Sequence, residues 1–290
     1  MVLSKAIQYA LIVVAWLSIS SASIIVVLSG ATALACAFWR LFIAALLIAL
    51  YSLFKGLKDF YLEDIKYISL SILSGIFLAT HFLTWMESLF YIPISLSTTI
   101  VVLYPLIAML YETVLRISRP RWSELIGVLV AFCGTVVAVR PYLVEKALYG
   151  SILAFSGAIT GAAYFTVGRY LRKKGVGLAS YTLVCYSTST IFLFAYSVVT
   201  KQSIIPGELN AWVYLVLLAL IPMLGGHTVI NYLVKYMKSY VATVIGFGEA
   251  PGATILASLI LSQDVSLNVL IGMAITMLGA LYTIREGVKQ

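Results

Sequence analysis

Two stretches of this chain repeat one another. Residues 81–110, HFLTWMESLFYIPISLSTTIVVLYPLIAML, align with residues 227–256, HTVINYLVKYMKSYVATVIGFGEAPGATIL, at a constant offset of 146. The offset places Pro105 on Pro251 and a histidine at the start of each stretch. Self-similarity at a long fixed interval indicates that a chain is built from homologous units. We therefore predict that the chain consists of two halves of similar structure.

The composition is that of a membrane protein. Of the 290 residues, 62% are apolar and 10% are charged, and the mean hydropathy is +1.05, whereas about 25% of the residues in a soluble domain are charged. An apolar run of about 18 or more residues can cross the hydrocarbon core as a helix. The sequence contains ten such runs, at 7–28, 31–52, 67–88, 95–115, 124–143, 148–168, 179–199, 211–233, 239–261 and 266–284.

The ten runs divide evenly, so that residues 1–145 and residues 146–290 each contain five predicted spans. Because five is odd, equivalent helices of the two halves cross the membrane in opposite directions. Inverted repeats of this kind are typical of secondary transporters, whose substrate site lies near the midplane between the halves. We predict an all-α membrane protein of ten transmembrane helices, arranged as two inverted five-helix repeats.

Positive charge is distributed unevenly between the two sides of the predicted bundle. When successive loops are assigned to alternate sides, fifteen Lys and Arg residues and both termini fall on one side, and three fall on the other. Basic residues concentrate in cytoplasmic loops, so we expect a multi-pass protein of the cell membrane with both termini in the cytoplasm. The formal charge of +8 is then an orientation signal, and we expect no nucleic-acid partner.

Several motifs resemble those of the EamA-type carriers in the drug/metabolite transporter superfamily. They are FWRLF at 38–42, a proline in the fourth and in the ninth span, IGMAITMLGA at 271–280, and the basic loops. The resemblance extends over the whole chain. It implies that spans one to four and six to nine surround a central cavity for a small-molecule substrate, with spans five and ten at the periphery. We expect no cofactor, and a monomer or homodimer in the lipid bilayer.

Glu249 is the strongest candidate for a functional residue. It lies about ten residues from either end of its span, near the midplane, with Gly246 and Gly248 beside it to admit another helix or a ligand. A charge at this depth costs about 2.5 to 3.5 kcal/mol or more, and burial disfavours the charged form of a carboxyl group. We interpret Glu249 as a proton-coupling site or as the counter-charge for a cationic part of the substrate. The alternative is a protonated residue that hydrogen-bonds between helices.

Other polar and aromatic side chains are candidates for the cavity wall. Arg40 lies too deep to reach the membrane surface easily, so it is either a structural clamp or an anchor for an anionic substrate group. The repeat also places two helix faces that carry a histidine in equivalent positions. These faces either bind substrate or gate the cavity, or their histidines are buried side chains that hydrogen-bond within the protein. The predicted substrate-binding residues are Trp16, Arg40, His81, Trp85, Tyr104, Tyr164, His227, Asn231 and Glu249.

Two prolines are predicted to bend the helices in which they lie. Pro105 and Pro251 each lie about ten residues into a span, where the missing amide leaves a carbonyl unpaired and bends the helix. They are predicted hinges that open the cavity, or else they only curve the helix.

Glu112 lies four residues before Arg116, the favourable order for an ion pair on a helix surface. We expect this pair at the interfacial end of the fourth span.

The repeat also pairs two sets of glycines. Gly127 and Gly134 correspond to Gly272 and Gly279, after a one-residue deletion in the preceding loop. Residues seven apart lie on one face of a helix, and small residues allow the backbones of membrane helices to approach closely. We expect these glycines to serve helix packing.

Secondary transport is the function that these features favour. We expect export of a small organic metabolite, amino-acid-like or amphipathic, by alternating access with proton coupling; the alternative is a uniporter or exchanger without coupling. An intramembrane enzyme is a remote alternative because the chain has no HExxH or GxSxG motif and no Asp within a span. A channel or a sensor is a third possible class of function. We predict no metal site, since Cys36, Cys133 and Cys185 lack paired spacing.

Overall fold

The computed structural model describes residues 3–55, 64–138, 145–261 and 267–288. Within these ranges the chain forms helices and no strands. Eight helical segments in the same ranges are long and apolar enough to cross a membrane, and α7 (Trp122–Ala138) is a shorter apolar helix. The predicted boundary between the halves lies at the start of α8, next to residues outside the described ranges, and stays a prediction.

The described helices form five segments in each half, at the places of the ten predicted spans. In the first half they are α1 (Lys5–Ser20) with α2 (Ala22–Ser29), α3 (Ala33–Lys55), α4 (Ile65–Ser88), α5 (Ile94–Val101) with α6 (Tyr104–Val114), and α7. In the second half they are α8 (Glu145–Lys173), α9 (Leu178–Thr200), α10 (Ala211–Leu218) with η1 (Ala219–Thr228) and α11 (Val229–Leu233), α12 (Ser239–Thr243) with η2 (Val244–Gly248) and α13 (Glu249–Leu261), and α14 (Leu267–Val288).

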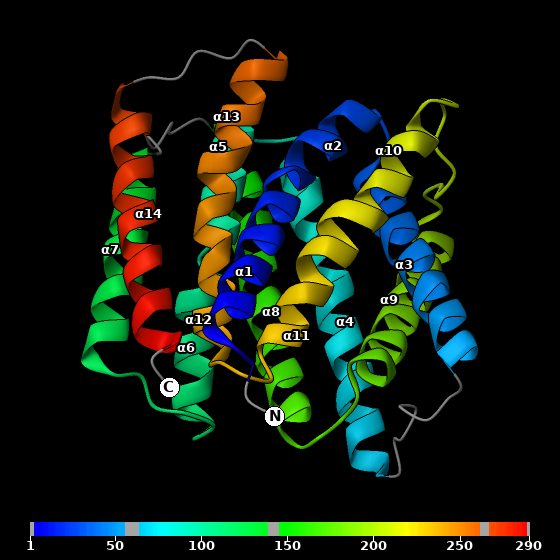
Figure 1. Cartoon of the computed structure of the whole chain (residues 1–290). Helices are drawn as coiled ribbons and strands as arrows, with labels where there is room; N and C mark the ends of the chain where they lie inside the picture. Colours follow the sequence, from blue (N-terminus) through cyan, green and yellow to red (C-terminus); the bar gives the residue numbers. More distant parts are fainter. Residues whose placement is uncertain (1–2, 56–63, 139–144, 262–266, 289–290) are drawn as a thin grey trace.

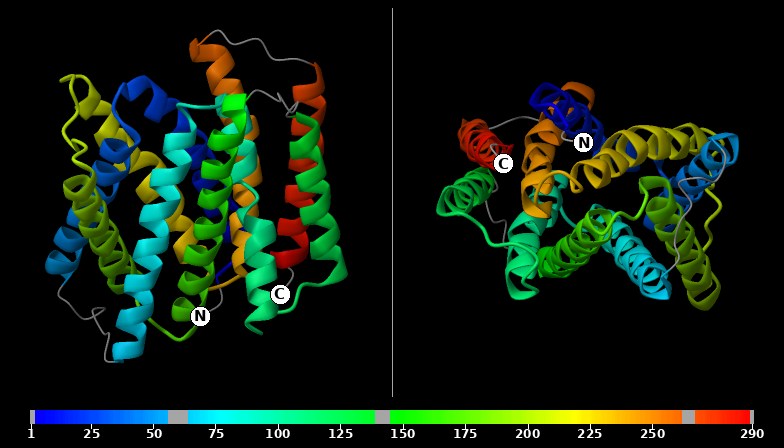
Figure 2. Two further views of the ribbon diagram at one scale, coloured as in Figure 1. Left: turned by 180° about the vertical axis from the view of Figure 1, so that it is seen from behind. Right: turned by 60° about the horizontal axis from the view of Figure 1, so that its bottom comes forward.

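The two halves are inverted with respect to one another. Both termini lie at the same end of the bundle, and successive segments run in alternating directions, so that α1 and α8 are antiparallel (Figure 1). The helices α7 and α14 pack against each other at one edge of the bundle (Figure 2). This edge position agrees with the peripheral place that the resemblance implies for the fifth and tenth spans.

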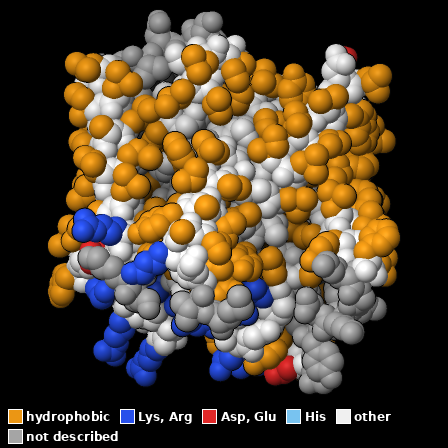
Figure 3. Space-filling view, in the orientation of Figure 1, with side chains coloured by type: hydrophobic (Ala, Val, Ile, Leu, Met, Phe, Trp, Pro, Cys, Tyr) orange, Lys and Arg blue, Asp and Glu red, His pale blue; other side chains and the backbone are white. Residues whose placement is uncertain are grey.

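The surface is that of a protein surrounded by lipid. Large apolar side chains such as Phe54 and Val199 are exposed, and apolar side chains are spread over the face shown in Figure 3. Small residues such as Ala37 and Ala79 fill the contacts between helices, as is usual where helices associate in a membrane. Lys and Arg side chains gather at the end that carries both termini (Figure 3). We call this end the basic end.

Two spans are interrupted at equivalent places near their middle. The helix α5 ends at Val101, and α6 begins at Tyr104, directly before Pro105. In the other half, α12 gives way to η2, a 3-10 turn, and α13 begins with Pro251 in its first turn. Because proline has no amide hydrogen, it cannot continue the hydrogen bonds of the preceding turn. The interruptions agree with the predicted bends, while the hinge role of both prolines stays a prediction.

The close packing of α7 on α14 generates a prediction about stability. An added Cβ would lie 2.8 Å from the Gly272 carbonyl oxygen at Gly134, and 2.7 Å from the Gly127 carbonyl oxygen at Gly279. Because the backbone cannot move aside cheaply, Gly279→Val should lower the free energy of unfolding by about 1 to 3 kcal/mol, measured as a lower Tm in detergent. Gly207→Ala is the control, since that site is open. A Gly279→Val protein with the wild-type Tm would contradict the packing.

Candidate functional site

A small pocket lies between the two halves, where the interrupted spans meet α1 and α4. Its free volume is about 10 Å³, which is about the space that one water molecule needs. The helices are therefore closed around it. Five of the nine predicted substrate-binding residues are part of its wall. The wall consists of Ile19, Ala22, His81, Trp85, Val101, Tyr104, His227 and Glu249.

Two histidines, one from each half, stand side by side in this wall. The ring centroids of His81 and His227 are 5.9 Å apart. The Nδ1 atom of His81 lies 2.8 Å from the Gly157 carbonyl oxygen, and because a carbonyl only accepts, this Nδ1 carries a proton. His227 stacks on Phe165 with centroids 5.5 Å apart. Its Nδ1 has no hydrogen-bond partner among the described residues, so this nitrogen is available to a ligand.

Arg40 is a buried cation next to this wall. It is fully buried on α3, and its guanidinium carbon lies 4.0 Å from the centre of the Phe82 ring, which in turn lies 4.9 Å from the His227 ring. None of its three side-chain nitrogens has a hydrogen-bond partner among the described residues. Glu249 interacts with it electrostatically, but the ion pairs of the described residues do not include Arg40. A buried cation without an acceptor is costly, so Arg40 can bind an anionic group.

Glu249 is positioned by contacts of the interrupted ninth span. It begins α13 and is 6% exposed. The turn before it is held by Trp16, whose Nε1 donates a hydrogen bond of 2.7 Å to the Gly248 carbonyl oxygen. A Cβ added at Gly246 would collide with the Tyr104 ring, and one at Gly248 with the Trp16 ring. These two glycines therefore allow α1 and α6 to close on the turn that presents Glu249.

Tyr164 and Asn231 lie behind the pocket. The Nδ2 atom of Asn231 donates to the Tyr164 hydroxyl and, over 2.9 Å, to the His227 carbonyl oxygen. Both side chains are fully buried. Together with Trp16 and Arg40, they are the four predicted substrate-binding residues that are not part of the wall in this closed arrangement. Substrate contact remains a prediction for all nine residues.

Two buried ion pairs lie outside the predicted site residues. The predicted surface pair of Glu112 with Arg116 is wrong: Glu112 is fully buried and forms an ion pair of 3.1 Å with Arg169. Glu124 pairs with Lys238 at 2.8 Å. Both cations count as loop charges in the sequence. One sequence feature indicates these pairs: Glu112 lies within an apolar run and Glu124 at the start of another, and an acidic side chain at such a place needs a partner.

Both halves of the chain match the same protein family. The model of the EamA-like transporter family matches the chain twice, over residues 4–140 and 148–285. This chain belongs to the EamA-like transporter family. The family is part of the drug/metabolite transporter superfamily, so the resemblance seen in the sequence is confirmed. Membership makes the protein a membrane transporter and argues against an enzyme.

Two further similarities agree with this membership. An uncharacterized transporter from Archaeoglobus fulgidus is 23% identical to this EamA-like transporter over 198 residues, which cover 68% of this chain and 70% of that protein. A crystal structure of another protein has a TM-score of 0.77 and 17% sequence identity, and the match covers 99% of both chains. At this identity the structural likeness concerns the fold alone.

In this EamA-like transporter, the bond from Trp16 to Gly248 generates a prediction about the site. Trp16→Phe removes the donor of this hydrogen bond, so the free energy of unfolding should fall by about 0.5 to 1.5 kcal/mol, and the displaced turn should impair transport in proteoliposomes. Trp39→Phe is the matched control, because Trp39 Nε1 donates to the Ile204 carbonyl at 2.8 Å, away from the pocket wall. It should lose similar stability and keep transport. Equal loss of transport in both variants would argue against a positioning role.

Proposed function

We propose that this EamA-like transporter exports a small amino-acid-like solute through the central pocket by alternating access. The observation that carries the proposal is the unpartnered guanidinium of Arg40. A buried cation at this place suits the carboxylate of a substrate, with which guanidinium forms strong paired hydrogen bonds. Glu249 supplies the opposite charge in the wall, and it suits a substrate ammonium group. A zwitterion satisfies both.

The rest of the wall supports a small amphipathic solute. Trp85 and Tyr104 offer aromatic surface, and Ile19 offers apolar surface, for the substrate's side chain. The Nε1 atom of Trp85 has no hydrogen-bond partner among the described residues and is a further donor for a carboxylate. A phosphorylated solute needs several cations, and the described part of the wall contains no Lys or Arg.

The inverted halves support alternating access. A free volume of about 10 Å³ is too small for an amino acid, so the halves have to tilt before a solute enters and brings its carboxylate to Arg40. Two inverted halves can tilt in either sense, which gives two open states related by symmetry. We place the basic end in the cytoplasm of a cell-membrane protein, since basic loops face that side.

Glu249 connects transport to protons in this proposal. Its carboxylate can hold either the substrate's ammonium group or a proton, and the two exclude one another. Exchange of one for the other is antiport, in which protons moving inward drive the solute outward. Four titratable groups from other elements are near Glu249: Arg40 interacts with it electrostatically, and the other three share the wall. They are Arg40 on α3, His81 on α4, Tyr104 on α6 and His227 on η1.

The first prediction from this proposal concerns Arg40. In a thermal-shift assay of purified protein, an amino acid should raise the Tm, and the carboxylic acid or the amine with the same side chain should each raise it less. Arg40→Gln should weaken amino-acid binding by about tenfold or more, or about 1.4 kcal/mol, while Arg285→Gln, an exposed arginine on α14, should leave it unchanged. An amine that binds as well as the amino acid would contradict the anchor.

The second prediction concerns Glu249. Glu249→Gln removes the exchangeable proton but keeps the shape of the side chain, so uptake of the amino acid driven by a pH gradient in proteoliposomes should be abolished. The Tm of the unliganded protein should stay close to the wild-type value. Glu208→Gln, which changes an exposed acid, should transport normally. Gradient-driven uptake that survives in Glu249→Gln would exclude the coupling role and favour an uncoupled uniporter or exchanger.

A further inference from the structure

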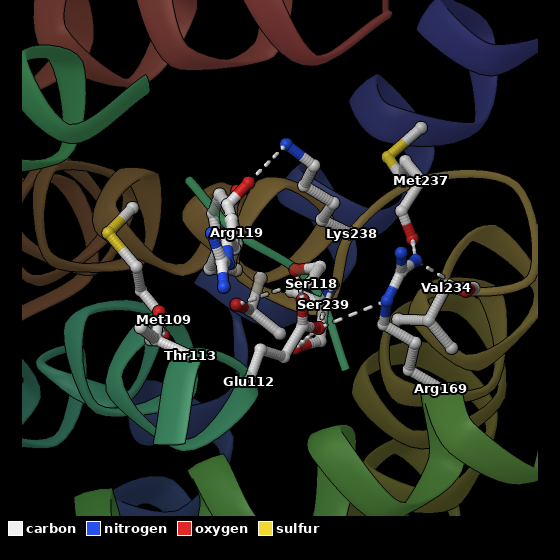
Figure 4. Close-up of polar contacts among 12 residues, drawn as sticks. Met109, Glu112, Thr113, Ser118, Arg119, Arg169, Val234, Met237, Lys238 and Ser239 are labelled. Carbon is white, nitrogen blue, oxygen red and sulfur yellow. Dashed lines mark hydrogen bonds and ion pairs between the residues drawn. The ribbon is translucent and has the colours of Figure 1, made fainter. Parts of the chain in front are cut away.

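A cluster of buried polar groups joins helices of the two halves (Figure 4). The Oε1 atom of Glu112, near the end of α6, lies 3.1 Å from Arg169 Nε on α8. The same oxygen accepts a hydrogen bond of 2.7 Å from the Ser239 amide at the start of α12. The hydroxyl groups of Ser118 and Ser239 also donate to this carboxylate. One carboxylate of the first half therefore holds two elements of the second half.

A second ion pair strengthens the same connection. Glu124, at the start of α7, accepts hydrogen bonds of 2.8 Å from Lys238 Nζ and 3.0 Å from the Tyr240 hydroxyl. The ammonium group of Lys238 also donates to the Arg119 carbonyl at 3.1 Å. Glu124 is fully buried, and Lys238 is 8% exposed. The start of α12 is thus fixed to the connection between α6 and α7. We call Glu112, Arg169, Glu124 and Lys238 the basic-end cluster.

The basic-end cluster joins the same helices that form the pocket. Glu112 lies eight residues after Tyr104 on α6, which is about 12 Å along a helix at 1.5 Å per residue. Arg169 lies five residues after Tyr164 on α8, and Lys238 lies eleven residues before Glu249 in the interrupted ninth span. The helices α6 and α8 and the interrupted ninth span therefore run from the pocket region toward the basic end. The cluster holds these three helices together.

The sequence repeat does not reproduce this cluster at the opposite end. The offset of 146 places Ile92 on Lys238 and Pro93 on Ser239. Neither Ile92 nor Pro93 offers a cation or a hydroxyl group. The two open states of an inverted repeat are related by symmetry, but a polar connection at one end stabilises only the state in which that end is closed.

We infer that the basic-end cluster is the gate that closes the pocket toward the basic end. The inference rests on the alternating access proposed above. Both ion pairs have to separate before a solute passes, because each connects helices that move apart. Removing a charge from water is costly, and this cost offsets much of the attraction within a buried pair. Water that enters on opening hydrates the separated charges, so a gate of ion pairs can open reversibly. These residues control the cycle without touching the substrate.

Accessibility from each side of the membrane tests the gate. A cysteine at Ala22, in a variant with Cys36, Cys133 and Cys185 replaced by alanine, reports on the pocket wall through its reaction with a membrane-impermeant thiol reagent in oriented vesicles. Arg169→Gln should raise the reaction rate from the basic-end side about tenfold and lower it from the opposite side. Lys238→Gln should do the same, and Arg169→Lys should keep much of the wild-type behaviour.

A matched control is the polar contact between Thr135 on α7 and Thr276 on α14, whose hydroxyl oxygens are 3.2 Å apart away from the pocket wall. Thr135→Val should leave both rates unchanged. If Arg169→Gln does not fold, the double variant Glu112→Gln with Arg169→Gln removes both charges and should give the same shift.

Two results would overturn the gate. One is an unchanged rate from the basic-end side in a variant with the wild-type Tm. The other is an equal increase from both sides, which reports loosened packing. Because the labelling needs no substrate, the two proposals fail separately: a wild-type labelling pattern with saturable amino-acid transport rejects the gate alone. The expected shift without transport of any amino acid rejects the proposed substrate alone.

Discussion

In a hydrocarbon environment each backbone amide and carbonyl has to find its partner within the protein. This constraint makes every described span helical, and it makes any interruption depend on neighbouring helices. The break before Glu249 meets it with the indole of Trp16, which donates to the Gly248 carbonyl, and with glycines that let α1 and α6 approach. Interrupted backbone occurs at membrane depth only where protein or a cavity surrounds it. The pocket lies at the two interrupted spans, so the same requirement for backbone partners explains where the helices are interrupted and where the pocket lies.

Charges inside the bundle follow the same constraint, with two different outcomes. At the basic end, Glu112 and Glu124 each have a cation within 3.1 Å and further hydrogen-bond donors. At the centre, the guanidinium of Arg40 has aromatic carbon on one side and no acceptor among the described residues. Charges that have partners hold helices together, whereas a charge without a partner can bind a ligand. This contrast distinguishes the proposed gate from the proposed binding site within a single bundle.

The sequence was informative where a property is local or repeated, and uninformative where it depends on packing between distant helices. The lengths of the apolar runs predicted ten spans, and the odd number of spans in each half predicted that the halves are inverted. Pro105 and Pro251 marked the helix interruptions. Five candidate residues share one wall, and two of them, His81 and His227, occupy equivalent positions of the repeat. The partner of Glu112 was missed because proximity along one helix suggested Arg116, while the true cation is on α8. Glu124 and Lys238 are 114 positions apart, and a buried lysine looks like a loop charge in sequence.

The central claim is that a pocket between inverted halves carries an amino-acid-like solute across the membrane. Counterflow tests it most directly. Proteoliposomes containing the wild-type protein are loaded with a high concentration of an unlabelled amino acid that raises the Tm, and a trace of the labelled amino acid is added outside. A carrier should accumulate label transiently above the equilibrium level, with an initial rate that saturates. Equilibration without an overshoot, or a flux that rises linearly with concentration, would contradict transport by alternating access.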